Sequence, residues 1–523
     1  MADVFLQSLH DRFDPAREAG KDDPVAWLND RLDEVAWSKQ QEIMRSVQDN
    51  QRTAVPSCHG SGKSHIASRV ICRFIDIHEP GTAFVVTTAP RAHQVRAILW
   101  RYIRRAHKKA GLLGTITQGQ IPEWKIDGDL VGFGRKPADM DADTFQGLHE
   151  YRLLIVFDEA CGIGSELYTA AESLMTNDGC HWLCIGNPDD NSSFFHKVCT
   201  TEPGWNRIRI SAMDTPAVTG EQVPDEVAQR LVSKAWIEDK RLRWGETSPL
   251  FQAKVLGQWV DSPDGLVPLS WARSAVARWH QWQERPDRLT GHEPPGRRVI
   301  GVDPAWMGTD MTAIVVRQGP VILSARTYSR MDTQQVASLV LAELRHPGAT
   351  CVVDTIGIGA GVVDALRHAG ANVIAFNGSA STKRRDNTGT WRFPNCRSAA
   401  WYNLREILDP IHGGQLCLPD NDELVADITT PNYGPVANGM LKVEAKDDVK
   451  RRIGRSPDLG DALCYSLWTD PPGNRVSTAD PLEPRDYSPR AIPYASNSRT
   501  LEDWSPHGYG PPPGPRRVYR SSR

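Results

Sequence analysis

The stretch from Ser57 to Ser64, which reads SCHGSGKS, constrains the fold of this chain more than any other feature. It follows a short apolar run and precedes a segment with helical alternation. Small residues there let backbone N–H groups curl around phosphate oxygens, while a lysine reaches the β and γ phosphates and a hydroxyl holds Mg²⁺. The residues predicted to form this phosphate-binding loop are Ser57, Gly60, Ser61, Gly62, Lys63 and Ser64. A plain glycine-rich turn is the alternative, because Ser57 stands where the common GxxxxGK[ST] pattern has its first glycine.

Two further apolar runs end in polar residues suited to the same chemistry. Residues 153–157 lead into the adjacent carboxylates Asp158 and Glu159. Asp158 is predicted to lie in the Mg²⁺ shell and Glu159 to polarise an attacking water, the alternative being that both acids cap the next helix. A later run ends at Asn187-Pro188, where the amide is predicted to sense a γ-phosphate, although Asn-Pro is also a common turn.

Other candidates for nucleotide contacts lie outside the loop. A helix is predicted to open at Trp37, some twenty residues before the loop, and a glutamine there is suited to the adenine edge. Gln40 is preferred over Gln41, although both are also explained as solvated helix residues. Arg91 and Arg135 are candidate arginine fingers, and each is equally explained as an ordinary surface arginine.

The 523 residues are too many for one hydrophobic core, so at least two domains are expected. Residues 1–36 are predicted to be a loosely helical lead-in, and residues 37–261 alternate strand-like and helical runs as a parallel α/β sheet does. Residues 262–297, rich in charge, Trp, Pro and Gly, are predicted to be a linker. A second α/β pattern covers residues 298–470, and the Pro/Arg-rich residues 471–523 are predicted to be a disordered tail.

Bulk properties exclude several classes of protein. No apolar run approaches the about 20 residues that a membrane span needs, and the N-terminus lacks the apolar core of a signal peptide. The ten cysteines form no CxxC pair, which argues against structural zinc or a disulfide framework and is typical of a reducing cytoplasm. Because the formal net charge is −3, any nucleic acid must be bound by local patches.

The second α/β pattern delivers acids from three separate segments. Asp303 and Asp354 each end an apolar strand, whereas Asp458 and Asp461 lie at i and i+3 on one face of a helix start. Clustered carboxylates repel one another, so such a site is stable mainly with divalent metals, and two cations about 3.5–4 Å apart would promote phosphodiester cleavage. Singly, each acid is also explained as a turn or N-cap residue. Asp310 is assigned to a hairpin turn.

A basic stretch lies just upstream of the last two acids. Its members are Lys446, Lys450, Arg451, Arg452 and Arg455. Such cations would pair with a DNA backbone without reading its sequence, although a solvated basic helix face explains them equally well. Asp447 and Asp448 lie within the stretch and dilute its field.

Taken together, these residues resemble the large terminase subunit of tailed bacteriophages, from about Trp37 to Trp468. Further motifs that carry the resemblance are TFQGLH at 144–149, IGNP at 185–188, FF at 194–195, FPNCR at 393–397 and the GRSPDLGDA ending at 454–462. The resemblance implies an N-terminal P-loop ATPase domain of the ASCE, RecA-like type, joined to a C-terminal ribonuclease H-like nuclease domain. It also implies a motor that hydrolyses ATP to translocate double-stranded DNA into a procapsid and that cleaves concatemeric DNA.

The resemblance further implies cofactors, partners and roles. ATP with Mg²⁺ would serve the first site, and Mg²⁺ or Mn²⁺ a two-metal second site. The implied partners are viral DNA, the portal of a procapsid, a small terminase subunit and further copies in a pentameric ring, in the host cytoplasm rather than in the mature virion. The matching residues are Lys63, Ser64, Asp158, Glu159 and Asn187 in the first half, and Asp303, Asp354, Asp458 and Asp461 in the second. Which of Asp458 and Asp461 is the principal third ligand stays open.

Two other functions remain open from the sequence. A helicase or repair translocase would share the first half, but it normally has a second RecA-like domain where this chain has acids. A non-catalytic capsid-docking protein would keep the acids as structural residues. The tail, including Arg516–Arg520, is a candidate portal-docking segment or simply a disordered end.

Overall fold

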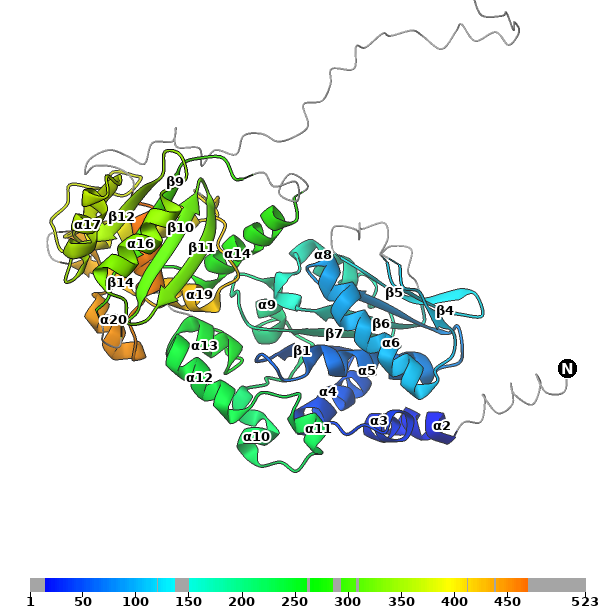
Figure 1. The fold of residues 1–523 in the computed structure, drawn as a ribbon. Coiled ribbons are helices and arrows are strands. Elements are labelled where there is room, and N and C mark those ends of the chain that lie inside the picture. Colours follow the sequence, from blue (N-terminus) through cyan, green and yellow to red (C-terminus); the bar gives the residue numbers. More distant parts are fainter. Residues whose placement is uncertain are drawn as a thin grey trace, which may run out of the picture. The chain divides into compact units, whose positions relative to one another are not determined.

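The computed structural model shows, in its described residues, two large β-sheets with helices on their faces and a small two-stranded sheet (Figure 1). The residues it describes are 15–119, 121–136, 150–260, 264–285, 293–306, 310–411, 413–436 and 439–468. The predicted TFQGLH motif and the predicted tail lie outside these residues. Among the described helices, none is both long and apolar enough to cross a membrane.

The first sheet, as far as it is described, contains eight strands and carries the phosphate-binding loop. Its strands are β1 (Arg52–Pro56), β2 (Ala83–Thr88), β3 (Thr115–Ile116), β4 (Glu123–Ile126), β5 (Asp129–Arg135), β6 (Arg152–Asp158), β7 (Cys180–Gly186) and β8 (Asn206–Arg207). They follow the order β3-β4-β5-β2-β6-β7-β1-β8, with β4 antiparallel to β3 and β5 and the other neighbours parallel. One strand, β7, thus separates the loop strand β1 from the acid-bearing β6, as in the expected ASCE-type fold.

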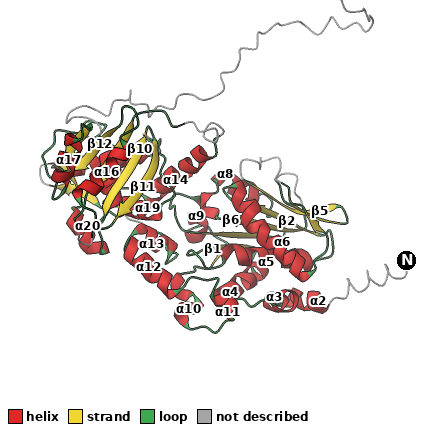
Figure 2. Cartoon of the chain, in the orientation of Figure 1, coloured by secondary structure: helices red, strands yellow, loops and turns green. Residues whose placement is uncertain are grey.

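Helices and short turns surround this sheet (Figure 2). The longer helices are α2 (Pro15–Asp22), α3 (Pro24–Leu32), α4 (Ser38–Asp49), α5 (Lys63–Asp76), α6 (Trp100–Ala110), α8 (Ser165–Glu172), α9 (Phe194–Thr200), α12 (Lys234–Trp244) and α13 (Pro249–Lys254). The shorter elements are η1 (Gln94–Leu99), η3 (Ala160–Gly162), η4 (Ala212–Asp214), α10 (Pro216–Thr219) and α11 (Asp225–Ala228). Within the predicted lead-in, α3 is firmly packed, because Trp27 and Leu28 are buried.

The segment predicted to be a linker contains a fifteen-residue helix, α14 (Leu269–Gln283). Ala272, Ala275 and Val276 on this helix are buried, a helical spacing that the density of charge and tryptophan in the sequence obscures. Arg273 on the same helix pairs with Asp422 at 3.2 Å. Fifteen residues of the predicted linker therefore form a packed helix.

The second sheet, in the described residues, has five strands in the arrangement of ribonuclease H-like domains. They are β9 (Arg298–Asp303), β10 (Thr312–Gln318), β11 (Val321–Tyr328), β12 (Thr350–Asp354) and β13 (Val373–Phe376). The order is β11-β10-β9-β12-β13, with β10 antiparallel to both neighbours and β9, β12 and β13 parallel. Because β9 and β12 are parallel and adjacent, Asp303 and Asp354 end at the same edge. The expected fold class is confirmed in both halves.

Alternating side chains of the second sheet face different helices. The helices are α16 (Thr333–Glu343), α17 (Gly359–His368), α18 (Cys396–Leu408), α19 (Asp422–Thr429), α20 (Lys446–Ile453) and α21 (Asp458–Ser466), and a small hairpin joins β14 (Tyr433–Val436) to β15 (Met440–Val443). Ile300 and Val302 pack in one cluster with residues of α16 and α17, whereas Val299 belongs to the cluster that contains α21. This period of two is the strand pattern expected when both faces are covered.

Helix α21 lies unusually close to β9, and Gly301 permits it. A Cβ atom at residue 301 would overlap the carbonyl oxygen of Ala462 and would lie 2.5 Å from the amide nitrogen of Ser466. Every residue of α21 is buried, so the helix has no room to move outward. The close approach brings the acids at the start of α21 to the end of β9.

We predict that Gly301→Ala destabilises the protein by about 3 kcal/mol, because the methyl group forces α21 away from the sheet. Gly434→Ala is the matched control, since a Cβ at residue 434 meets no atom within 4 Å, and its effect should stay within about 0.5 kcal/mol. Thermal unfolding of both variants tests this. Equal melting temperatures would contradict the close packing described here.

Candidate functional site

Two glycines, Gly60 and Gly62, give the phosphate-binding loop its curvature, and a third glycine at residue 57 is not needed. Gly60 and Gly62 have φ values of 64° and 81°, in the left-handed region that disfavours side chains. Ser57 instead prolongs strand β1, because its N–H donates to the carbonyl of Gly186 at 2.9 Å. Its hydroxyl lies 2.6 Å from that of Ser61, so the two side chains brace the loop from within. The departure from the usual pattern therefore falls at a position that needs no glycine.

Hydrogen bonds divide the loop into an anchored half and a half suited to phosphate. The amides of Ser57, Cys58 and His59 donate to backbone carbonyls of other segments at 2.8–2.9 Å, namely those of Gly186, Ile210 and Lys254. Phosphate binding therefore falls to the amides from Gly60 onward, at the N-terminus of α5. Val232 covers this half, since its amide donates to the carbonyl of Gly60 at 3.2 Å. No local sequence pattern predicted that contact, because it joins segments about 170 residues apart.

Lys63 lies among the residues predicted to act with it. Its Nζ is 3.3 Å from Oδ1 of Asn187 and 3.6 Å from Oε1 of Glu159. Burial alone would lower the pKa of Lys63, but the charges of Glu159 and Asp158 raise it above its usual value. The lysine thus stays positively charged where the β and γ phosphates are expected.

Asp158 and Ser64 form the pair expected for magnesium. The Ser64 hydroxyl donates to Oδ2 of Asp158 at 2.8 Å, and the amide of Glu159 donates to Oδ1 at 3.1 Å. Burial, together with the neighbouring Glu159 charge, raises the pKa of Asp158 to about 6. A hydroxyl and a buried carboxylate side by side supply the hard oxygen atoms that Mg²⁺ prefers.

Glu159 adopts an unusual backbone conformation beside this pair. Its φ is 50°, in the left-handed region, and its side chain remains about one-third exposed. Strain of this kind recurs where a side chain must be aimed at a particular point. The conformation leaves the Glu159 carboxylate at the mouth of the site, while Asp158 is fully enclosed.

Asn187 connects the end of β7 to the loop through both ends of its amide. Nδ2 donates to the carbonyl of Ser57 at 2.6 Å, and Oδ1 accepts from Lys63. Its side chain is buried. The predicted sensing residue therefore contacts the first residue of the loop and the lysine directly.

Of the other residues predicted to contact the nucleotide, Gln40 is the one that the structure places against the loop. Gln40 is buried, with Nε2 3.5 Å from the carbonyl oxygen of Ser61, whereas Gln41 donates to the carbonyl of Ala36. The structure thus places Gln40, and not Gln41, against the loop, and its adenine contact stays a prediction. The Arg135 guanidinium lies over the Phe133 ring at 5.0 Å, and the arginine-finger roles of Arg91 and Arg135 also stay predictions.

In the second half, three predicted acids surround one lysine. Nζ of Lys446 lies 2.6 Å from Asp303, 3.1 Å from Asp458 and 3.5 Å from Asp461. Burial raises the pKa of Asp303 well above its usual range, and Lys446 opposes that rise while the other two acids add to it. Burial would lower the pKa of Lys446, but the three carboxylates raise it well above its usual value. Sequence reasoning assigned this lysine only to the DNA backbone.

Asp354 lines a cavity of about 670 Å³ that it shares with members of the Lys446 group. This cavity is also lined by Asp303 and Lys446, and the Tyr465 hydroxyl donates to Asp354 at 3.3 Å. Burial raises the pKa of Asp354, because desolvation disfavours its charged form. The acids from β9, β12 and α21 therefore converge as the sequence predicted.

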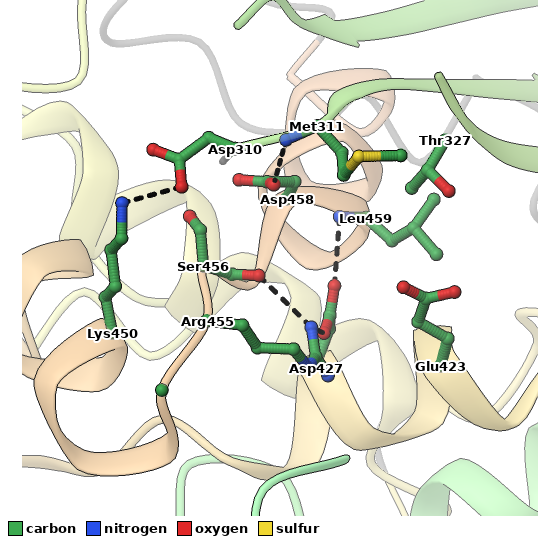
Figure 3. Close-up of a pocket in the computed structure, with 11 residues that line it drawn as sticks. Asp310, Met311, Thr327, Glu423, Asp427, Lys450, Arg455, Ser456, Asp458 and Leu459 are labelled. Atoms are coloured by element: carbon green, nitrogen blue, oxygen red, sulfur yellow. Dashed lines mark hydrogen bonds and ion pairs between the residues drawn. The ribbon is translucent and has the colours of Figure 1, made fainter. Parts of the chain in front are cut away.

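Asp458 and Asp461 differ in their surroundings. Asp461 is fully buried, and its Oδ1 accepts from Trp401 at 2.6 Å and lies 3.3 Å from Arg397. Asp458 instead borders a second cavity of about 90 Å³, where its Oδ2 accepts from the amide of Met311 at 3.1 Å (Figure 3). The principal third ligand stays undecided between them, but Asp461 is the more firmly held.

These acids are suited to a divalent cation because two of their buried oxygens lack hydrogen-bond donors in the described part of the chain. As far as the structure describes them, they do not form a preformed set of metal ligands. Within the described ranges, no three His, Cys, Asp or Glu side chains are grouped to hold a metal ion. Oδ1 of Asp458 and Oδ2 of Asp461 are nevertheless buried without a hydrogen bond from any described residue, and both face the Lys446 ammonium. Buried carboxylate oxygens without donors are suited to a cation.

The other cations of the basic stretch also have carboxylate partners. Lys450 pairs with Asp310 at 2.6 Å, Arg452 with Glu444 at 2.7 Å, Arg451 with Asp448 and Arg455 with Asp427. Most of the stretch is thus engaged by ion pairs within the chain, whereas the Arg451 side chain is largely exposed. Asp310, assigned to a hairpin turn, has an ion-pairing role as well.

Comparisons with known proteins agree with the expected resemblance. No family model matches the sequence. The chain is 21% identical over 464 residues to a probable terminase large subunit of Enterobacteria phage P7, covering 82% of this chain and 87% of that protein. The similarity to a large terminase subunit predicted from the motifs is thereby confirmed.

Two solved structures are also similar. The nuclease domain of the large terminase subunit of bacterial virus Sf6 is 22% identical, covers 39% of this chain and 99% of its own, and has a TM-score of 0.33. The large terminase of a thermophilic bacteriophage, solved in complex with ADP, is 14% identical, covers 82% of this chain and 98% of its own, and has a TM-score of 0.36.

We predict that Gly62→Ala lowers ATP hydrolysis by at least about 10-fold. A Cβ there would overlap the Gln40 amide, and a left-handed residue other than glycine costs about 1–2 kcal/mol. Ser57→Gly, which restores the common motif, should stay within about 3-fold of the wild type, because Ser57 has no positive φ. Steady-state phosphate release measures both. A large gain from Ser57→Gly would show that the loop is incomplete without that glycine.

We predict that Asp158→Asn abolishes ATP hydrolysis yet stabilises the fold at pH 8. The folded pKa of Asp158, about 6, exceeds its ordinary value of 3.8, so burying the ionised form costs stability above pH 6. The stabilisation should reach about 3 kcal/mol at pH 8, decrease as the pH falls through 6, and vanish below pH 4. Thermal unfolding from pH 4 to 8 checks the sign. A gain independent of pH would contradict the assignment.

Proposed function

We propose that this chain is the large subunit of a viral DNA-packaging motor. It hydrolyses ATP to translocate double-stranded DNA into a procapsid, and it cleaves concatemeric DNA with a metal-dependent endonuclease. The observation that carries the proposal is that one chain holds two groups of candidate catalytic side chains. One group surrounds Lys63 on the first sheet, and the other surrounds Lys446 on the second sheet. Similarity to a probable terminase large subunit over most of both chains supports the same function.

The proposed ATPase chemistry follows from the contacts in the first site. Amides from Gly60 onward and Lys63 bind the phosphates, and Ser64 with Asp158 holds Mg²⁺. Glu159, aimed from its strained turn, orients and polarises the attacking water. Asn187 accepts a hydrogen bond from Lys63. It loses that hydrogen bond when a γ-phosphate pairs with the lysine instead.

The proposed nuclease chemistry centres on the cavity at the ends of β9 and β12. Asp303, Asp354 and the Asp458/Asp461 pair would hold Mg²⁺ or Mn²⁺, which supplies an activated water and neutralises charge on the leaving oxygen. The Lys446 ammonium holds Asp303, Asp458 and Asp461 close together by ion pairing. The mouth of the cavity includes the exposed side chains of Trp306 and Ile356, which are available to the DNA.

The partners and location are proposed from the terminase resemblance. They are viral DNA, the portal of a procapsid, a small terminase subunit and further copies of the chain in a ring of five, in the cytoplasm of the infected host. A helicase or repair translocase is disfavoured, because the second sheet has ribonuclease H-like strand order where a helicase has a second RecA-like domain.

We predict that Lys63→Ala and Asp303→Ala separate the two activities. Lys63→Ala should abolish ATPase and packaging by removing the phosphate-binding charge, yet leave Mn²⁺-dependent plasmid cleavage largely intact. Asp303→Ala should abolish cleavage and spare ATP hydrolysis, because it lies on the other sheet. Phosphate release, plasmid nicking and DNA protection by procapsids are the measurements.

Each variant serves as the control for the other. Wild-type cleavage by Asp303→Ala would refute the nuclease site, and wild-type ATPase by Lys63→Ala would refute the phosphate loop. Absence of both activities from the wild-type protein would favour a capsid-docking protein whose acids are structural.

A further inference from the structure

A further buried carboxylate, Asp427 on helix α19, lies behind the nuclease acids and has no part in the chemistry described above. Its side chain is 1% exposed, and it lines the smaller cavity beside Asp458. Isolated buried carboxylates are unfavourable unless they accept several hydrogen bonds or pair with a cation. Asp427 does both.

The hydrogen bonds of Asp427 are made to the first turn of another helix. Its Oδ2 accepts from the amide of Leu459 at 2.9 Å (Figure 3). It also accepts from the amide of Gly460 at 3.3 Å. These two amides follow Asp458 directly, at the end of α21 where backbone N–H groups lack partners within the helix. Pro457 precedes the helix and cannot act as a side-chain cap, so the cap comes from α19 instead.

The charge of Asp427 is balanced from the opposite side. Arg455, three residues before Asp458, forms an ion pair with Oδ1 of Asp427. The Arg455 guanidinium also donates to the carbonyl of Ser456 at 3.1 Å, which ties it to the turn entering α21 (Figure 3). One carboxylate therefore holds both the turn before α21 and the amides of its second and third residues.

Packing leaves α21 no alternative position. A Cβ on Gly460 would lie 2.6 Å from the Trp401 ring and 3.2 Å from Cβ of Asp427. Trp401 also donates to Asp461 at 2.6 Å. The start of α21 is thus fixed between α18 and α19, with Asp458 and Asp461 on the side that faces Lys446.

We propose that Asp427 is a positioning residue of the nuclease, which caps α21 so that Asp458 and Asp461 present to a divalent cation the oxygens that face Lys446. This inference rests on the proposed metal-dependent nuclease. The Arg455 pair makes the cap electrostatically neutral, because an unpaired arginine next to Asp458 would repel the cation. Removing the negative charge of Asp427 alone should therefore weaken metal binding even where the fold survives.

The test compares Asp427→Asn with Glu423→Gln. The amide introduced by Asp427→Asn keeps an oxygen that accepts the α21 amides but leaves Arg455 without its counter-charge. Glu423 lies on the same helix and lines the same cavity (Figure 3), so its variant removes an equal charge without touching the cap. Mn²⁺ binding is measured by calorimetry without nucleotide, and plasmid cleavage is measured across Mn²⁺ concentrations. The assays run at pH 8, above the pKa of about 7 to which burial raises Asp427.

For Asp427→Asn we expect the Mn²⁺ midpoint to rise about 10-fold, with ATP hydrolysis unchanged. Glu423→Gln should stay within about 2-fold of the wild type. The double variant Asp427→Asn with Arg455→Met removes both charges and should bring the midpoint back toward the wild-type value, which a purely structural loss would not do. The double variant also tests the proposal if Asp427→Asn alone folds poorly.

Equal midpoints for Asp427→Asn and Glu423→Gln would overturn the proposal, as would a double variant no better than the single one. Calorimetry separates this result from the proposed function. If the wild type binds Mn²⁺ in an Asp427-dependent way but cuts no DNA, the positioning role stands and the nuclease assignment fails.

Discussion

A lysine held beside carboxylates is the interaction on which both sites depend. Lys63 lies between Asn187 and Glu159, and Lys446 lies among three aspartates. Burial by itself would neutralise such groups, since the charged form of each is poorly solvated. The carboxylates raise the pKa of each lysine, so both lysines keep their positive charge. In the proposed function that charge would meet phosphates at the first site and hold the acids together at the second.

The two sheets present these groups by the same rule. Parallel strands bring residues that follow their carboxyl ends to one edge, and polar side chains placed there converge. In the first sheet β6 and β7 deliver Asp158 and Asn187 beside the loop after β1. In the second, β9 and β12 deliver Asp303 and Asp354, and α21 closes the group because Gly301 lets it approach. The same arrangement of parallel strand ends thus forms both the proposed ATPase site and the proposed nuclease site.

The strand-end residues were predictable because apolar runs and their terminal acids are local patterns. The run 153–157 lies within β6, and Asp303, Asp458 and Asp461 meet as expected. The central role of Lys446 was missed, since nothing local distinguishes it from the cations that follow. Asp427 had no signal at all, because its partners lie about 30 residues away. Helix α14 was hidden because its buried face consists mainly of alanines.

The amide of Asn187 has a further consequence. Its Oδ1 already accepts from Lys63, the group that a γ-phosphate would need in the proposed ATPase. Nucleotide binding would then exchange one partner of the lysine for another, and the affinity would be the difference between the two bonded states. A ligand without a γ-phosphate would leave Lys63 bonded to the Asn187 amide, so loss of the phosphate would restore that hydrogen bond.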